Sequence, residues 1–338
     1  MNTKLKTAVS IAGCGLILIL GIGIGSVFIP PKDIIKIIFC KITQREITGI
    51  ADTFIAIVWN VRLPRVLVGF LTGGSLAVSG AVMQSVLKNP LASSYTMGVS
   101  SGAAFGAALV IATGIYLPLI PNFTLPIAGT VFGLLSVYAA VKFASLIDKN
   151  FENGTIILAG IVFALFINGI ITLLIALNRH GMAQLIFWQM GSFSTQNIKN
   201  FFVLLPFTAA GIFILTVFSR ELDMLTFGEE QAASMGVNTK KIKWLFLFSA
   251  SALTGISISF TGIIGFIDLI APHLVRKIFG VNHKIVIPMS FVLGGTAMVL
   301  FDMAARTILS PQELPVGAIT ALIGAPFFCY VYFSGRRK

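Results

Sequence analysis

The chain has 338 residues, of which 56% are hydrophobic and only 11% are charged. Soluble domains carry about 25% charged residues, so this composition excludes an ordinary soluble protein and predicts an integral membrane protein. The formal net charge of +12 is spread among loops without interleaved aromatic platforms, which argues against a nucleic-acid-binding protein.

Candidate membrane spans are found as apolar runs without Asp, Glu, Lys or Arg. About twenty apolar residues cross a bilayer, so each run can supply at least one helix. The run 89–141 is long enough for two helices and is divided by the turn-rich stretch 114–122. The runs are 7–31, 66–87, 89–141, 153–178, 200–219, 244–267, 285–301 and 314–335.

A tenth span is required by the positive-inside rule, because Lys4, Lys6 and the basic residues 336–338 belong on the same, cytoplasmic side. The best candidate is 262–279, which is mostly apolar but contains Asp268, His273 and Arg276. We therefore predict an all-α protein of about ten transmembrane helices in one compact permease domain, 1–338. We expect a multi-pass protein of the cell membrane with both termini on the cytoplasmic side.

Small residues indicate how these helices pack. Gly98, Gly102 and Gly106 lie on one face of a helix and predict close approach to a neighbour. The stretch 74–80 loosely echoes 251–257, in two spans that would run in opposite directions. This match hints at a weak inverted internal repeat, which is a common plan of transporters.

Several kinds of chemistry are missing from the sequence. No Lys follows a Gly, so the chain has no P-loop for ATP. The histidines and cysteines lie on separate segments without metal-ligand spacing, which predicts no metal, no cofactor and no enzymatic activity. Only Asp268 and Asp302 are carboxylates within spans, whereas ion-coupled carriers use several. A bulky substrate fits this passage better than an ion.

One short polar helix, within 226–238, separates two apolar runs. Thr226 and Glu229 have the spacing of a capping box, and Gly236 can end the helix in a left-handed turn. The small side chains of Ala232 and Ala233 suit insertion into a groove on another protein. The alternative is a linker helix that lies on the membrane surface.

A series of motifs, in order across roughly residues 55–335, resembles the FecCD permease family, the membrane subunits of ABC importers for iron–siderophores, haem and cobalamin. The motifs are Arg62-Leu-Pro-Arg65, Gly80-Ala-Val-Met-Gln84, Lys88-Asn-Pro-Leu-Ala92, Met97-Gly-Val-Ser-Ser-Gly102, Leu158-Ala-Gly160, Trp188-Gln-Met-Gly-Ser192, Gly228-Glu-Glu230, Met235-Gly-Val237, Gly262-Ile-Ile-Gly-Phe266, Pro272-His-Leu-Val-Arg276 and Glu313-Leu-Pro-Val-Gly317.

The resemblance implies a second permease subunit, identical or different, two cytoplasmic ABC ATPase subunits and an extracytoplasmic substrate-binding protein. It also implies that the segment of about 222–241 docks on the ATPase and couples hydrolysis to transport. The implied coupling residues are Gly228, Glu229, Glu230, Ala232, Ala233, Met235 and Gly236.

Two further roles come with the resemblance. Arg62, Arg65 and Arg306 would pair with acidic residues of the binding protein, the alternative being anchoring of snorkelling side chains at lipid headgroups. Asn89 and Leu91 would help close an inner gate, the alternative being a plain helix end.

The sequence thus predicts a permease subunit that imports an iron–siderophore complex by alternating access, with ATP hydrolysed on the partner. Haem or cobalamin as cargo, and an ion-coupled secondary transporter, are the alternatives. Asp268 departs from the family, which more often has Gly there, and its role is left open.

Overall fold

The computed structural model describes residues 3–177 and 181–334, and every regular element in these ranges is helical. The first part of the chain forms α1 (Thr3–Gly23), α2 (Pro31–Ile42), α3 (Asp52–Ala56), the π-helical turn η1 (Ile57–Arg62), α4 (Leu63–Val86), α5 (Val99–Thr113), the 3-10 turn η2 (Pro121–Phe123), α6 (Thr124–Ile147) and α7 (Asn153–Leu177). The second part forms α8 (Met182–Gln189), α9 (Ile198–Val217), α10 (Ser219–Phe227), α11 (Glu229–Ser234), α12 (Thr239–Thr261), α13 (Ile267–Phe279), α14 (His283–Ala305) and α15 (Val316–Ser334).

Within the described residues, seven helical segments are long and apolar enough to cross a bilayer, and α5 and α15 are shorter apolar helices. With α13, the predicted tenth span, they confirm an all-α membrane protein of about ten spans. The expected first span, 7–31, is too long. α1 ends at Gly23, because Pro30 and Pro31 belong to the start of α2, where Pro occupies the first helical turn. The basic residues 336–338 lie outside the described ranges.

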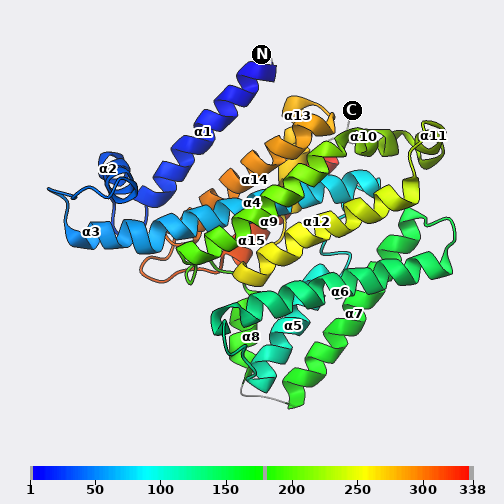
Figure 1. Ribbon diagram of the computed structural model, residues 1–338, viewed down its shortest axis with the longest axis horizontal. Helices are drawn as coiled ribbons and strands as arrows, with labels where there is room; N and C mark the ends of the chain where they lie inside the picture. The colour runs from blue at the N-terminus through cyan, green and yellow to red at the C-terminus, as the bar shows by residue number, and fades with distance from the viewer. Residues whose placement is uncertain (1–2, 178–180, 335–338) are drawn as a thin grey trace.

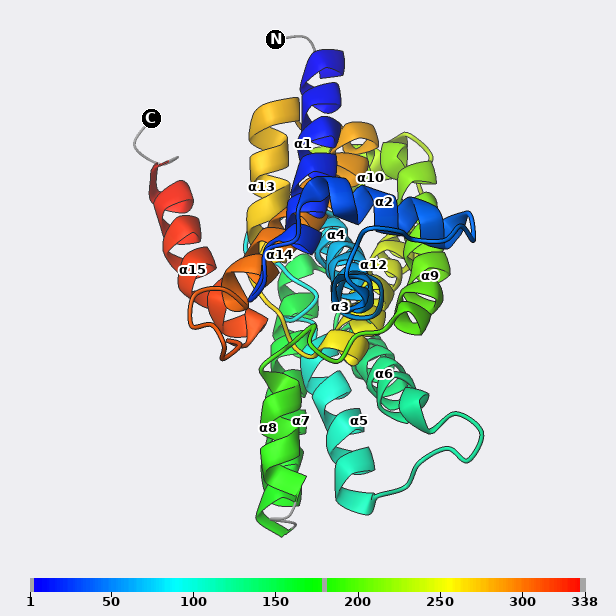
Figure 2. The ribbon, with the colours of Figure 1, turned by 90° about the vertical axis from the view of Figure 1, so that its left-hand side faces the viewer.

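α4 is the central helix of the bundle (Figure 1), flanked by α13 and α14 on one side and by α9 and α12 on the other. α12 also contacts α6, which packs with α5 and α7 in a second group of helices. Figure 2 shows α15 at the edge of the bundle. Its neighbours there are α13 and α14.

Small residues explain the close packing at the centre. A Cβ atom on Gly80 would overlap the carbonyl oxygen of Asp268, so α4 and α13 meet with backbone against backbone. The predicted glycine face of α5 is confirmed, since a Cβ on Gly106 would lie 2.5 Å from the carbonyl oxygen of Ala128 in α6.

The contacts between helices define two ends of the bundle. Lys6 at the start of α1 donates a hydrogen bond to the carbonyl of Ile278 at the end of α13, at 2.6 Å. α10 lies at this same end, which we call the α10 end. The opposite end carries Arg62, Arg65 and Arg306, and we call it the arginine end. α4 and α12 pack together and run in opposite directions, while the internal repeat stays a prediction.

Candidate functional site: polar networks at the two ends of the bundle

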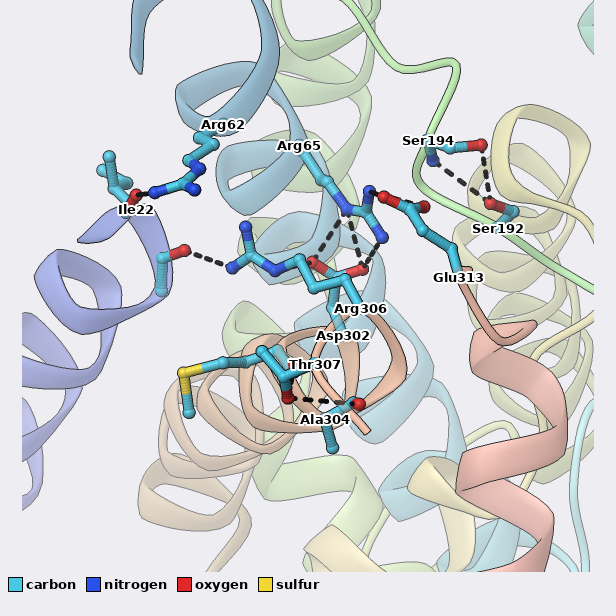
Figure 3. Close-up of polar contacts among 12 residues, drawn as sticks. Ile22, Arg62, Arg65, Ser192, Ser194, Asp302, Ala304, Arg306, Thr307 and Glu313 are labelled. Carbon is cyan, nitrogen blue, oxygen red and sulfur yellow. Dashed lines mark hydrogen bonds and ion pairs between the residues drawn. The ribbon is translucent and has the colours of Figure 1, made fainter. Parts of the chain in front are cut away.

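The three arginines predicted to dock the binding protein lie close together (Figure 3). Arg65, near the start of α4, donates from Nε and Nη2 to Asp302 of α14, at 2.9 and 2.8 Å from Oδ1. Its Nη1 donates to both carboxylate oxygens of Glu313, each at 2.9 Å. All three nitrogens of the Arg65 guanidinium group therefore donate to two carboxylates of the same chain.

The other two arginines bind the end of α1. Arg62 donates to the carbonyl oxygens of Ile22, Gly23 and Val27, at 3.0, 2.7 and 2.5 Å. Arg306 donates to the carbonyl of Gly21, and its Nε lies 3.6 Å from Asp302. The last carbonyls of a helix have no partner within the helix, and these cations supply one to the carbonyls of Gly21 and Ile22.

Burial lowers the pKa of Arg306 to about 10, although the neighbouring Asp302 raises it. The side chain stays charged at neutral pH. All three guanidinium groups are buried, and the charged group that this network exposes is Glu313, whose side chain is 43% exposed. Their hydrogen bonds in the structure are to groups of this chain, and anchoring at lipid headgroups stays the alternative. Docking to a binding protein stays a prediction for these arginines.

A cavity of about 580 Å³ lies beside this network at the arginine end, between the end of α8, the end of α12 and the start of α15. Glu313 is its charged wall, Trp188 and Phe260 are its aromatic walls, and Ser192 and Ser194 contribute hydroxyl groups that lie 2.9 Å apart. It could receive a ligand with both apolar and hydrogen-bonding surface.

At the other end, the polar segment predicted as one helix is two. Gly228 separates α10 from α11 with φ of 146°, which favours glycine. The predicted capping box is wrong: Thr226 belongs to α10 and donates to the carbonyl of Asp223 at 2.6 Å. Glu229 instead forms an ion pair of 2.7 Å with Lys243 of α12. The predicted left-handed turn at Gly236 is confirmed by φ of 89°.

The side chains of α11 face in two directions. Ala232 is fully buried against the hydrophobic core of its own chain, so the expectation that it inserts into a partner is wrong. Glu230, Ala233, Met235 and Gly236 are exposed. A six-residue helix fixed on one side by Ala232 thus presents Ala233 and Met235 to the surroundings.

Lys243 was missed by the sequence analysis. Its side chain is 1% exposed, and its ammonium group donates to Glu229 and to the carbonyl of Phe151, both at 2.7 Å. It therefore connects α11 to the loop between α6 and α7. Lys243 directly precedes the apolar run 244–267, a position typical of a solvated basic residue at the end of a span, and no local pattern indicates that it is buried.

The predicted gate residues lie in the loop 87–98 between α4 and α5. The side chain of Asn89 accepts a hydrogen bond of 2.9 Å from the amide of Leu91, which folds a tight turn. Leu91 is 46% exposed at the tip of this turn. An exposed leucine at the α10 end suits contact with another subunit, and the gating role stays a prediction.

Next to this loop is a cavity of about 680 Å³, bounded by the ends of α4 and α13 and the start of α14. In its wall, Ser85 Oγ lies 2.6 Å from His283 Nε2, and His283 Nδ1 lies 2.5 Å from Asp223 Oδ1. This is the order of a hydrolase triad. However, Ser85 Oγ also donates a hydrogen bond to the carbonyl of Ala81 in its own helix, at 2.9 Å. The three groups connect α4, α14 and α10 to one another.

Comparison with known proteins gives the family. The model of the FecCD transport family matches residues 13–334. The chain is 37% identical to the uncharacterized ABC transporter permease protein YvrB of Bacillus subtilis, over 95% of this chain and 91% of that protein. It is 36% identical to the cobalamin import system permease protein BtuC of Halobacterium salinarum, over 84% of this chain and 75% of that protein.

Among solved structures, an inward-facing metal-chelate type ABC transporter superposes with a TM-score of 0.80 at 29% identity, covering 95% of this chain and 98% of that chain. The fold, the order of the motifs and the family match agree along nearly the whole sequence. The chain belongs to the FecCD transport family and is a membrane permease subunit of the ABC importer type.

Proposed function

We propose that this permease imports an iron–siderophore complex across the cytoplasmic membrane by alternating access. It would work as a dimer with a second permease subunit, two cytoplasmic ABC ATPase subunits and an extracytoplasmic binding protein. The α10 end would face the cytoplasm, together with both termini. ATP would be hydrolysed on the partner subunits.

The similarity to a metal-chelate type transporter over 95% of the chain supports the choice of cargo. Haem and cobalamin are the alternatives within the family, and the relative BtuC of Halobacterium salinarum is named for cobalamin. Carboxylates in the described spans are few, and Asp302 is already paired with Arg65. This favours transport driven by ATP over an ion-coupled mechanism, in which several carboxylates would bind the coupling ion.

The observation that carries the ATP-driven mechanism is the exposed face of α11. It presents Ala233 and Met235 on a short helix that is fixed by the buried Ala232 and by the Glu229–Lys243 ion pair. A helix of six residues is unstable alone, so this shape is built and held by the protein. We propose that it docks in a groove of the ATPase.

The second permease subunit would cover a different surface. In α7, large apolar side chains are exposed, among them Leu165, Phe166 and Leu173. Such an apolar face can be covered either by lipid or by a second subunit. We propose that part of it, with Leu91 near the α10 end, meets the second subunit around the pathway.

A pull-down tests the coupling assignment. The parent chain is expected to retain its cognate ATPase in detergent, and Ala233→Trp is expected to lose it because the enlarged side chain overfills a tight groove. Glu46→Trp, at an exposed position in the loop after α2, is the matched control and should assemble normally. Normal assembly of Ala233→Trp would overturn this role of α11.

The cargo is tested separately. We expect the cognate binding protein, purified from iron-limited cells, to retain a ferric siderophore that mass spectrometry and iron analysis identify. Retained cobalamin or haem would replace the proposed cargo while leaving the family assignment in place.

A further inference from the structure

A series of hydrogen bonds begins on α10, next to the proposed docking helix. Asp223 Oδ1 accepts from the backbone amide of His283 at 3.1 Å and lies 2.5 Å from His283 Nδ1. His283 is the first residue of α14 and is buried. Asp223 therefore joins α10 directly to the start of α14.

The series continues into α4 and α13. His283 Nε2 lies 2.6 Å from Ser85 Oγ, and Ser85 Oγ accepts from Arg276 Nη2 at 3.3 Å. Arg276 Nη1 donates to Gln84 Oε1 at 2.6 Å, and Nη2 donates to the carbonyl of Ala81 at 3.0 Å. In these three hydrogen bonds Arg276 donates to neutral groups.

The last links reach the loop 87–98. Gln84 Nε2 donates to the carbonyl of Asp268 at 3.1 Å, and the carboxylate of Asp268 accepts from the hydroxyl of Ser93. Ser93 lies in the same loop as Asn89 and Leu91 and also accepts from the amide of Tyr95 at 3.1 Å. The only carboxylate near the middle of the tenth predicted span thus holds the loop that carries the predicted gate.

We propose that six positioning residues, Asp223, His283, Ser85, Arg276, Gln84 and Asp268, make the loop 87–98 move together with α10. This proposal rests on the proposed function, because α10 has something to transmit only if its neighbour α11 binds an ATPase. It assigns a role to Asp268, which the family resemblance does not provide.

Two physical features make the series suited to this task. Four of the six members, Ser85, Gln84, His283 and Asp268, are buried polar groups, for which the loss of a partner is costly, so a shift of one group favours a compensating shift of the next. The cavity of about 680 Å³ borders Gln84, Ser85, Arg276, His283 and Asp223, so these side chains have space in which to rearrange.

The backbone approach at Gly80 adds a rigid joint. Because α4 and α13 meet there without intervening side chains, the backbone of Asp268 lies directly against α4. The movable part is then the side-chain series and the loop 87–98, which is attached to α12 separately through Ser94, Ser79 and the carbonyl of Ala250.

The test is the ratio of cargo transported to ATP hydrolysed, measured in liposomes with the full complex. Asp223→Ala and Asp268→Ala are each expected to lower this ratio about tenfold, within the range typical of coupling between two sites, while assembly and ATPase activity stay near the parent values. A merely destabilised subunit would lose transport and ATPase activity together. Ser85→Ala removes a single oxygen and should show the same change of ratio if either aspartate variant fails to fold.

The double variant Asp223→Ala with Asp268→Ala should be no worse than the single variants, because both break the same connection. Ser75→Ala removes a buried hydrogen bond of 3.2 Å from α4 to Thr208 of α9, outside the series, and should leave the ratio unchanged. A parent-like ratio in Ser85→Ala and in the aspartate variants, or effects that multiply in the double variant, would overturn the proposal. A parent complex that shows no ATP-driven transport would instead overturn the proposed function, and with it the proposal that the six residues couple α10 to the loop 87–98.

Discussion

The hydrogen-bond networks around Arg65 and Arg276, at opposite ends of the bundle, hold their arginines in different ways. At the arginine end, buried Arg65 is matched by the full charges of Asp302 and Glu313. At the α10 end, Arg276 is held by the neutral acceptors Gln84, Ser85 and the carbonyl of Ala81.

This difference distinguishes a clamp, by which we mean a network that holds helices in place, from a connector, a network that joins parts able to move. Removing one partner of a buried ion pair leaves an uncompensated charge, so the arginine end is costly to rearrange. Hydrogen bonds between neutral groups, or to one charged group, contribute only about 0.5–3 kcal/mol each, and the α10 end also has a cavity beside them. The Arg65 network is therefore suited to holding α4 and α14 together, and the Arg276 network is suited to rearrangement.

The largest effect is therefore expected at Asp302. Asp302→Asn keeps the shape of the side chain but removes the charge that faces Arg65 and Arg306. We expect it to destabilise the subunit by about 3–5 kcal/mol, seen as a large fall of the thermal unfolding midpoint in detergent or a loss of expression.

Glu313→Gln is the matched control in the same network. Its carboxylate is 43% exposed, so its loss should cost only about 0–1 kcal/mol. Equal effects of the two substitutions would contradict the description of the arginine end as a clamp centred on Asp302.

A smaller effect is expected at the buried face of α11. Ala232→Trp overpacks the core of its own chain and should destabilise the subunit by about 1–3 kcal/mol, whereas Ala233→Trp should leave its thermal midpoint unchanged. Thermal unfolding of the isolated permease distinguishes the two. If Ala233→Trp were the more destabilising variant, the assignment of the two faces of α11 would be wrong.

The smallest effect on stability is expected at the exposed tip of the loop 87–98. Leu91→Ala removes little buried surface, so the unfolding midpoint should barely change. The variant should nevertheless let small solutes leak from vesicles that contain the dimer, because an apolar closure has been shortened. Parent-like leak rates with intact transport would return Leu91 to the role of a helix end.

Local patterns in the sequence were sufficient for the helices but not for the directions of their side chains. Charge-free runs predicted the spans, and the spacing of Gly98, Gly102 and Gly106 predicted a packed face. Ala232 and Ala233 are neighbours in a helix too short to show a periodic pattern, so the buried one could not be told from the exposed one. The Thr226–Glu229 pattern failed because Gly228 starts the helix between them.

The polar networks could not be predicted because their partners are far apart in the chain. Arg65 and Asp302 are separated by 237 positions, and Ser93 and Asp268 by 175. Arg65 and Asp268 are recognisable in the sequence as charged residues at or within spans, where a charge without a partner is costly. Neither signal indicates which partner, since that depends on how α4 packs against α13 and α14.

We propose above that this chain carries an iron–siderophore through the membrane, driven by ATP hydrolysis on its partner subunits. The most direct test reconstitutes it with its cognate ATPase and binding protein in liposomes and follows ferric siderophore labelled with radioactive iron, alongside labelled cobalamin. We predict uptake of the ferric siderophore that requires ATP, both partners and an intact α11 surface, with no uptake of cobalamin. Uptake driven by an ion gradient without the ATPase, or uptake of cobalamin in place of the siderophore, would contradict it.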